Sequence, residues 1–430
     1  MSDKDSLPEM PNEAAPSRLS RRLNTADAVA IGLSAMIGAG VFVAIGPASA
    51  SAGSGVLLGL VIAAFVAYCN ASSSAQLAAV YPESGGAYVY GRKQLAPFWG
   101  WLAGWGFVVG KLASCAAAAL TFGFYLYPSL ARPLAVGAVI LLTLANYRGI
   151  KKTAAVTWIL LTLVLIALGT IVFASTFGGS VNGKHLVPLS GTNGLHGILQ
   201  AGAIMFFAFA GYARIATLGE EVQEPKRTIP KAIFIALLIT LAIYMCVAVS
   251  ALLAVGAPVL ADAKAPLARA VEAGRFAWLS PIVKLGATVA TLGVLLSLML
   301  GISRTVFSMS ANGELPKWFS AVHPRYKVPH HAEVAVAALI AIIVLLGDVR
   351  SAIGFSSFTI LIYYAITNAA AFTLAPEKRL WPRWIALTGL FSCSLLALSL
   401  PAESLILGML VMLSGAAVFA VKNWMRRHIY

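Results

Sequence analysis

The apolar part of the chain opens with a segment that is long enough to cross a membrane yet is interrupted at its centre. Residues 28–48 read AVAIGLSAMIGAGVFVAIGPA. About 20 residues at ~1.5 Å each cross the ~30 Å hydrocarbon layer, but Gly38-Ala39-Gly40 disfavours a continuous helix. Broken backbone at membrane depth persists only where it lines a cavity or is buried in protein. This segment therefore constrains the fold more than any other.

A second apolar segment, residues 201–217, carries FFAFAGY around Gly211. Two interrupted segments of this kind, five predicted spans apart, are typical of proteins that bind a substrate near the bilayer midplane between discontinuous helices. The pattern favours a transporter over a passive membrane anchor.

The composition places the whole chain in the membrane class. Hydrophobic residues make up 59% and charged residues 11%, whereas a soluble domain carries roughly 25% charged residues. The first 25 residues are polar and lack an apolar core, so we expect a short disordered tail and no cleavable signal peptide. The four cysteines lie in apolar runs and are expected to be small buried hydrophobes. No histidine pair has metal-ligand spacing within a span, so we expect no metal, no cofactor and no enzyme active site.

Breaks between apolar runs predict about twelve spans, and the charged loops predict their orientation. The approximate bounds are 26–50, 54–79, 98–127, 133–147, 153–174, 196–219, 229–255, 278–310, 333–347, 351–374, 383–400 and 402–425. Of the basic residues, 21 fall on one side and 6 on the other, while Lys111, Arg214, Lys284 and Arg304 lie within spans. The positive-inside rule then predicts that both termini are cytoplasmic, in a plasma membrane or bacterial inner membrane. The charge of +15 is thus a topology signal, and we expect no nucleic-acid partner.

Four stretches, in order, resemble motifs of the amino acid–polyamine–organocation superfamily of permeases. They are IGAGVF in the first span, YPESGGAYVYGRKQLAPFWGWLAGW from Tyr81, FFAFAGY followed by LGEEVQEPKRTIPKAI, and SRTVFSMSANGELPKWFSAVHPRYKVP from Ser303. The resemblance implies an all-α, LeuT-like membrane protein with discontinuous helices 1 and 6. It also implies inverted five-helix repeats at 26–174 and 196–374, accessory helices at 383–425, and a site between spans 1, 3, 6 and 8.

The two interruptions supply the candidate substrate-binding residues. Amides freed at the start of the second half-helix, over Ile37, Gly38, Ala39, Gly40 and Val41, suit a substrate carboxylate. Close helix packing is the alternative reading of these small residues. Unwinding over the second segment would offer carbonyls to an ammonium group, with Phe209 or Tyr212 covering the pocket. That set comprises Phe206, Phe207, Ala208, Phe209, Ala210 and Gly211, and an ordinary aromatic stripe is its alternative.

Charged residues near the breaks bear on the substrate. Lys111, the one charge near the middle of span three, costs about 2.5–3.5 kcal/mol if unpaired. It lies where some light-chain exchangers of the superfamily have an Arg, and its predicted role is substrate contact or a proton-linked switch. A structural lysine bonded to carbonyls is the alternative. Relatives with cationic substrates often carry an acid at the position of Ala213, next to Arg214. The absence of an acidic residue at this position favours a neutral substrate.

Residues beyond the breaks are candidates for gating and coupling. Glu220 and Glu221 would pair with Arg304 or Lys93 as a cytoplasmic gate, although a solvated helix end is the plainer reading. Ser297, with Thr288 and Thr291, would help to hold sodium, but such hydroxyls usually bond to their own helical turn. These residues do not distinguish between proton coupling, sodium coupling and exchange.

The sequence therefore favours a secondary active transporter for a neutral amino acid, with proton coupling as the preferred mode. The alternatives are an amino acid exchanger, a carrier of cationic amino acids or polyamines and, more distantly, a membrane subunit that needs a partner protein. The resemblance to light-chain exchangers would place a cysteine after span three, and residues 128–132 contain none. We therefore expect membrane lipid and substrate as partners, and no disulfide-linked protein.

Overall fold

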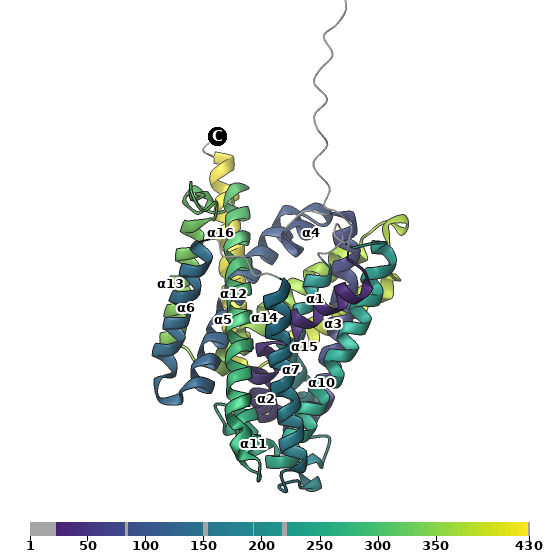
Figure 1. Cartoon of the computed structure of the whole chain (residues 1–430). Helices are drawn as coiled ribbons and strands as arrows, with labels where there is room; N and C mark the ends of the chain where they lie inside the picture. The colour runs from purple at the N-terminus through teal and green to yellow at the C-terminus, as the bar shows by residue number, and fades with distance from the viewer. Residues whose placement is uncertain (1–22, 82–84, 149–153, 192, 217–221, 429–430) are drawn as a thin grey trace, which may run out of the picture.

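The chain folds as a bundle made of helices (Figure 1). The computed structural model describes residues 23–81, 85–148, 154–191, 193–216 and 222–428. Over these residues the only β-type pairing is an isolated bridge between Leu23 and Val222. The α-helices are α1 Thr25–Met36, α2 Ala39–Ala52, α3 Val56–Val80, α4 Ala87–Gln94, α5 Pro97–Leu126, α6 Ala131–Tyr147, α7 Ala154–Phe177, α8 Gly194–Phe209, α9 Ala213–Ala216, α10 Pro225–Asp262, α11 Pro266–Glu272, α12 Ser280–Ala311, α13 His330–Leu346, α14 Val349–Phe372, α15 Arg383–Leu398 and α16 Ala402–His428.

The helices have the length and composition of a membrane protein. Within the described ranges, nine helical segments are long and apolar enough to cross a bilayer, and α1, α13 and α15 are shorter apolar helices. Each predicted span coincides with one helix or with an interrupted pair. The predicted end of span seven at residue 255 adjoins a kink in α10, where Gly256 has a φ of 75°. A residue with a Cβ seldom adopts that φ, so glycine permits the bend.

Two short helices, α4 and α11, were not among the predicted spans. α4 carries Arg92 and Lys93 in its last turn, and α11 is only seven residues long. Both are too short to cross a membrane, so a search for long apolar runs does not find them. They lie at opposite ends of the bundle, and α4 is at the end where α1 starts and α16 finishes (Figure 1). We call this the terminal end, and the other the distal end.

Small residues allow the helices of the core to approach closely. In α5, residues from Leu112 to Leu120 are all buried, and five of them are alanine. A methyl group on Gly59 of α3 would meet the backbone of α8 at Gly202 and Ile198. Membrane helices associate through such packing because lipid supplies little hydrophobic driving force between them. One cysteine departs from the expectation: Cys246 of α10 is exposed, whereas Cys69, Cys115 and Cys393 are buried.

Candidate functional site

The first predicted interruption is present at the centre of the first apolar segment. α1 begins with a reciprocal capping box between Asn24 and Asp27 and ends at Met36, and α2 begins at Ala39. Between them Gly38 has φ −142° and ψ −139°, and its amide donates to the Met36 carbonyl over 2.8 Å. No side chain caps the start of α2. Its first amides therefore have no partner within their own helix.

The second interruption lies later than predicted. α8 remains helical through Phe206, Phe207, Ala208 and Phe209, and the break is one 3₁₀ turn, η4 (Ala210–Tyr212), before α9. The expectation of unwound backbone from residue 206 is therefore wrong for its first four residues. Phe206 and Phe209 are fully buried and hold α8 against its neighbours, so the helix persists. At this end the Phe207 carbonyl accepts from the Ala210 amide, and the Ala208 carbonyl lies 3.3 Å from the Tyr244 hydroxyl.

The two interruptions lie against each other. A methyl group on Gly40 of α2 would collide with the backbone of Ala208 in α8, and one on Gly211 of η4 would collide with the backbone of Ala35 in α1. Gly38 in turn lies against Val294 of α12. Glycine is needed here for close approach rather than for a positive φ. The predicted Ile37–Val41 segment and the Ala208–Gly211 segment thus share one interface.

The aromatic side chains of the second segment are packed rather than poised over an open space. Tyr212 is fully buried with its ring centroid 5.3 Å from that of Tyr364, and Phe209 lies 5.5 Å from Tyr244 in an edge-on contact. The prediction that Phe209 or Tyr212 covers a pocket is not the arrangement seen. Phe207 is only partly buried and is the aromatic residue of this segment that is left least enclosed.

Lys111 and the hydroxyl side chains of α12 lie in two neighbouring helices, α5 and α12. Lys111 lies at the middle of α5, partly buried, and none of the carboxylates in the described ranges forms an ion pair with it. In α12, Thr288, Thr291 and Ser297 bond to the carbonyls of Lys284, Ala287 and Gly293, four residues back in each case. These three hydroxyls therefore bond to their own helical turns, which is the alternative that the sequence offered to a sodium site.

The predicted gate residues fall partly outside the described residues. Glu220 and Glu221 lie in the gap at 217–221, so their pairing with Arg304 or Lys93 is not described. Arg214 on α9 and Arg304 on α12 have exposed side chains, and the Lys93 ammonium lies 5.8 Å from the ring centroid of Tyr81.

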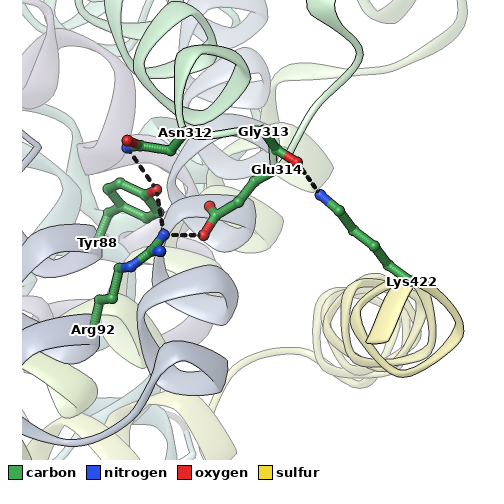
Figure 2. Close-up of polar contacts among 6 residues, drawn as sticks. All are labelled: Tyr88, Arg92, Asn312, Gly313, Glu314 and Lys422. Carbon is green, nitrogen blue, oxygen red and sulfur yellow. Dashed lines mark hydrogen bonds and ion pairs between the residues drawn. The ribbon is translucent and has the colours of Figure 1, made fainter. Parts of the chain in front are cut away.

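A different polar network joins three helices at the terminal end (Figure 2). Arg92 of α4 forms an ion pair with Glu314, just beyond α12, over 2.5 Å, and Asn312 donates to the Tyr88 hydroxyl over 3.0 Å. Lys422 of α16 donates to the Gly313 carbonyl. Burial and the nearby Glu314 charge raise the pKa of Tyr88, so this hydroxyl stays neutral. Sequence reasoning missed this network, although Arg92 and Glu314 both lie in quoted motifs.

At the distal end, contacts close off α2. The Tyr125 hydroxyl of α5 lies 3.3 Å from both the Phe42 carbonyl, which accepts, and the Leu267 amide of α11, which donates. Glu272 of α11 pairs with Lys284 of α12 over 2.8 Å. Burial alone would raise the pKa of Glu272, but hydrogen bonds from Lys284 and Ser280 outweigh it and lower the pKa. α11 thus bridges α2 to α5 and α12.

A helical membrane bundle with two interrupted helices that meet at their breaks has the architecture of a secondary transporter. An amino acid permease model matches residues 27–426, and the chain belongs to this family of transporters rather than to an enzyme family. The chain is 52% identical over 412 residues to an uncharacterized transporter of Mycobacterium tuberculosis, covering 96% of this chain and 93% of that protein.

Two more distant relatives carry substrate names. The chain is 28% identical over 341 residues to the branched-chain amino acid permease of Bacillus subtilis, covering 73% of this chain and 72% of that one. It is 29% identical over 393 residues to the cationic amino acid transporter 4 of Homo sapiens, covering 84% and 60%. The expected superfamily membership is confirmed.

Proposed function

We propose that this protein moves a neutral amino acid across the membrane by alternating access, with proton coupling. The observation that carries the proposal is the contact between the two helix breaks, Gly40 against Ala208 and Gly211 against Ala35. There the start of α2, which no side chain caps, lies against the end of α8. Opposite partial charges at such ends suit the two charges of a zwitterion.

The binding mode follows from these two ends. The substrate carboxylate would accept from the amides of residues 39–41, and its ammonium group would donate to carbonyls of residues 206–210. Phe207, which is partly exposed, would contact the substrate side chain. Lys111 would contact the substrate or carry the coupled proton.

The charge around the breaks supports a neutral substrate. Across α1, α2, α8, η4 and α9, the only acidic residue is Asp27, which is engaged in the capping box at the start of α1. A cationic side chain bound there would lack a carboxylate partner, and a desolvated charge without a partner is costly. The name of the Bacillus relative agrees with this substrate class, and that of the human relative suggests the alternative, a carrier or exchanger of cationic amino acids.

The proposal includes the arrangement expected from the sequence. The spans would form two inverted five-helix repeats, residues 26–174 and 196–374, with α15 and α16 as accessory helices. Rocking of the helices that carry the breaks would expose the site to one side at a time. The terminal end would face the cytoplasm, because the basic loops gather there.

Uptake by purified protein in liposomes tests the proposal. We expect labelled leucine or alanine to accumulate when an inward proton gradient is imposed, and excess unlabelled arginine or putrescine to leave this uptake unchanged. Liposomes without protein are the control. Uptake that needs sodium would overturn the coupling, inhibition by arginine would favour the cationic alternative, and no movement of any amino acid would reject the function.

A further inference from the structure

One tyrosine outside both interrupted helices contacts both breaks. Tyr244 lies in α10 and its side chain is fully buried. Its hydroxyl oxygen is 2.6 Å from the Met36 carbonyl oxygen, the last residue of α1, and 3.3 Å from the Ala208 carbonyl oxygen near the end of α8. These are the two stretches that meet at Gly40 and Gly211.

The Tyr244 hydroxyl adds a tertiary hydrogen bond to the backbone at the first break. The Met36 carbonyl already accepts from the Gly38 amide over 2.8 Å, so the phenol supplies a second donor from another helix. A phenol has a single proton, so at any moment Tyr244 donates to one of the two carbonyls. The shorter distance assigns the donated bond to Met36, and Ala208 is the alternative acceptor.

The rest of the side chain is anchored in the same place. The Tyr244 ring packs edge-on against Phe209, with centroids 5.5 Å apart. One turn earlier on α10, Thr240 is also fully buried, and its hydroxyl lies 4.0 Å from the Met36 sulfur. α10 therefore presents one face to the end of α1 and to the end of α8. This packing determines the position of the Tyr244 hydroxyl group.

We propose that Tyr244 is a positioning residue that sets the relative placement of the two helix breaks. The hydroxyl holds the end of α1 and the last turn of α8 at a common point, so that the amides of α2 face the carbonyls of α8. This inference rests on the proposed function only for its effect on transport. The alignment of the breaks is a property of the protein without substrate.

Tyr244→Phe removes the hydroxyl and keeps the ring, so it separates positioning from packing. We expect the KM for leucine uptake to rise about three- to tenfold, the range of one buried hydrogen bond, with the maximal rate per folded transporter retained. A role in packing alone would reduce the yield of folded protein and leave KM unchanged. Replacement by 4-aminophenylalanine, which keeps a donor at the same position, should restore KM.

Hydrogen exchange gives a measurement that does not depend on transport. In Tyr244→Phe, peptides covering residues 33–41 and 206–215 should exchange faster than in the wild type. Tyr68→Phe is the matched control, because its ring packs edge-on against the exposed Phe234. Wild-type exchange in Tyr244→Phe would overturn the inference. If the wild-type protein transports no amino acid in liposomes but Tyr244→Phe still exchanges faster, the proposed function is rejected and the inference about Tyr244 stands.

Discussion

Individual glycines determine how closely the two interrupted helices approach. At Gly40 and Gly211 the partner across the interface is backbone, which cannot rotate away as a side chain can. Any Cβ would push the two breaks apart, so even alanine is not tolerated without a shift of a helix. Lys111 poses the opposite problem, since its long cationic side chain stands at mid-membrane depth without a carboxylate partner in the described residues.

Lys111→Met tests whether this charge takes part in transport. We expect uptake in liposomes to fall about tenfold or more, the loss of a charge-assisted hydrogen bond, with normal amounts of protein in the membrane. The measurement is the initial uptake rate over a range of pH, with Lys184→Met in the exposed loop after α7 as the control. Uptake equal to wild type at every pH would remove Lys111 from the mechanism.

At the scale of elements, the two halves of the first interrupted helix are held by different partners. α1 is bonded through Tyr244 to α10, whereas α2 is bonded through Tyr125 to α5 and α11. α1 also borders an apolar groove of about 500 Å³ that is lined by Val29, Leu33 and residues of α7 and α10. The half-helix at the terminal end thus borders an open apolar groove, while most residues of the half at the distal end are buried.

Tyr125→Phe should loosen the distal end. Loss of a buried hydrogen bond worth about 1 kcal/mol would shift the equilibrium about fivefold toward opening there. The measurement is labelling of Ser49→Cys on α2 by an impermeant thiol reagent, in a background carrying Cys246→Ser. Ser49 is buried, so equal labelling rates with and without the Tyr125 hydroxyl would show that it does not hold this end closed.

For the whole molecule, the network of Figure 2 joins segments that are far apart in the sequence. Arg92 and Glu314 are separated by 222 residues, and Lys422 of α16 reaches the same turn. The Glu314 side chain is 12% exposed and that of Arg92 is 42% exposed. Removing Arg92 takes this cation away from a largely buried carboxylate, which costs more free energy than the pair contributes.

Arg92→Ala should therefore destabilise the protein more than Glu314→Gln does. We expect a loss of about 1–3 kcal/mol for the former, seen as a lower thermal midpoint in detergent. The double variant Arg92→Ala/Glu314→Gln should regain part of this loss, because the side chain that Arg92 faced is then neutral. Additive effects in this cycle would contradict coupling between the two side chains.

The sequence by itself determined the membrane class, the positions of the long apolar helices and the first break. Hydropathy and the Gly38-Ala39-Gly40 run are local properties, and neighbouring residues alone set them. The second break was placed less well, because buried aromatic packing around Phe206 and Phe209 extends α8 to residue 209.

Only the tertiary structure decided which helices meet and which side chains join them. The bonds of Tyr244 to Met36 and Tyr125 to Phe42 span 208 and 83 residues, and the residues next to each tyrosine do not indicate its partner. Such pairings arise when packed helices bring a hydroxyl within hydrogen-bond distance of a backbone carbonyl on another segment. A local pattern does not encode these pairings, because they join groups that become neighbours only in the folded bundle.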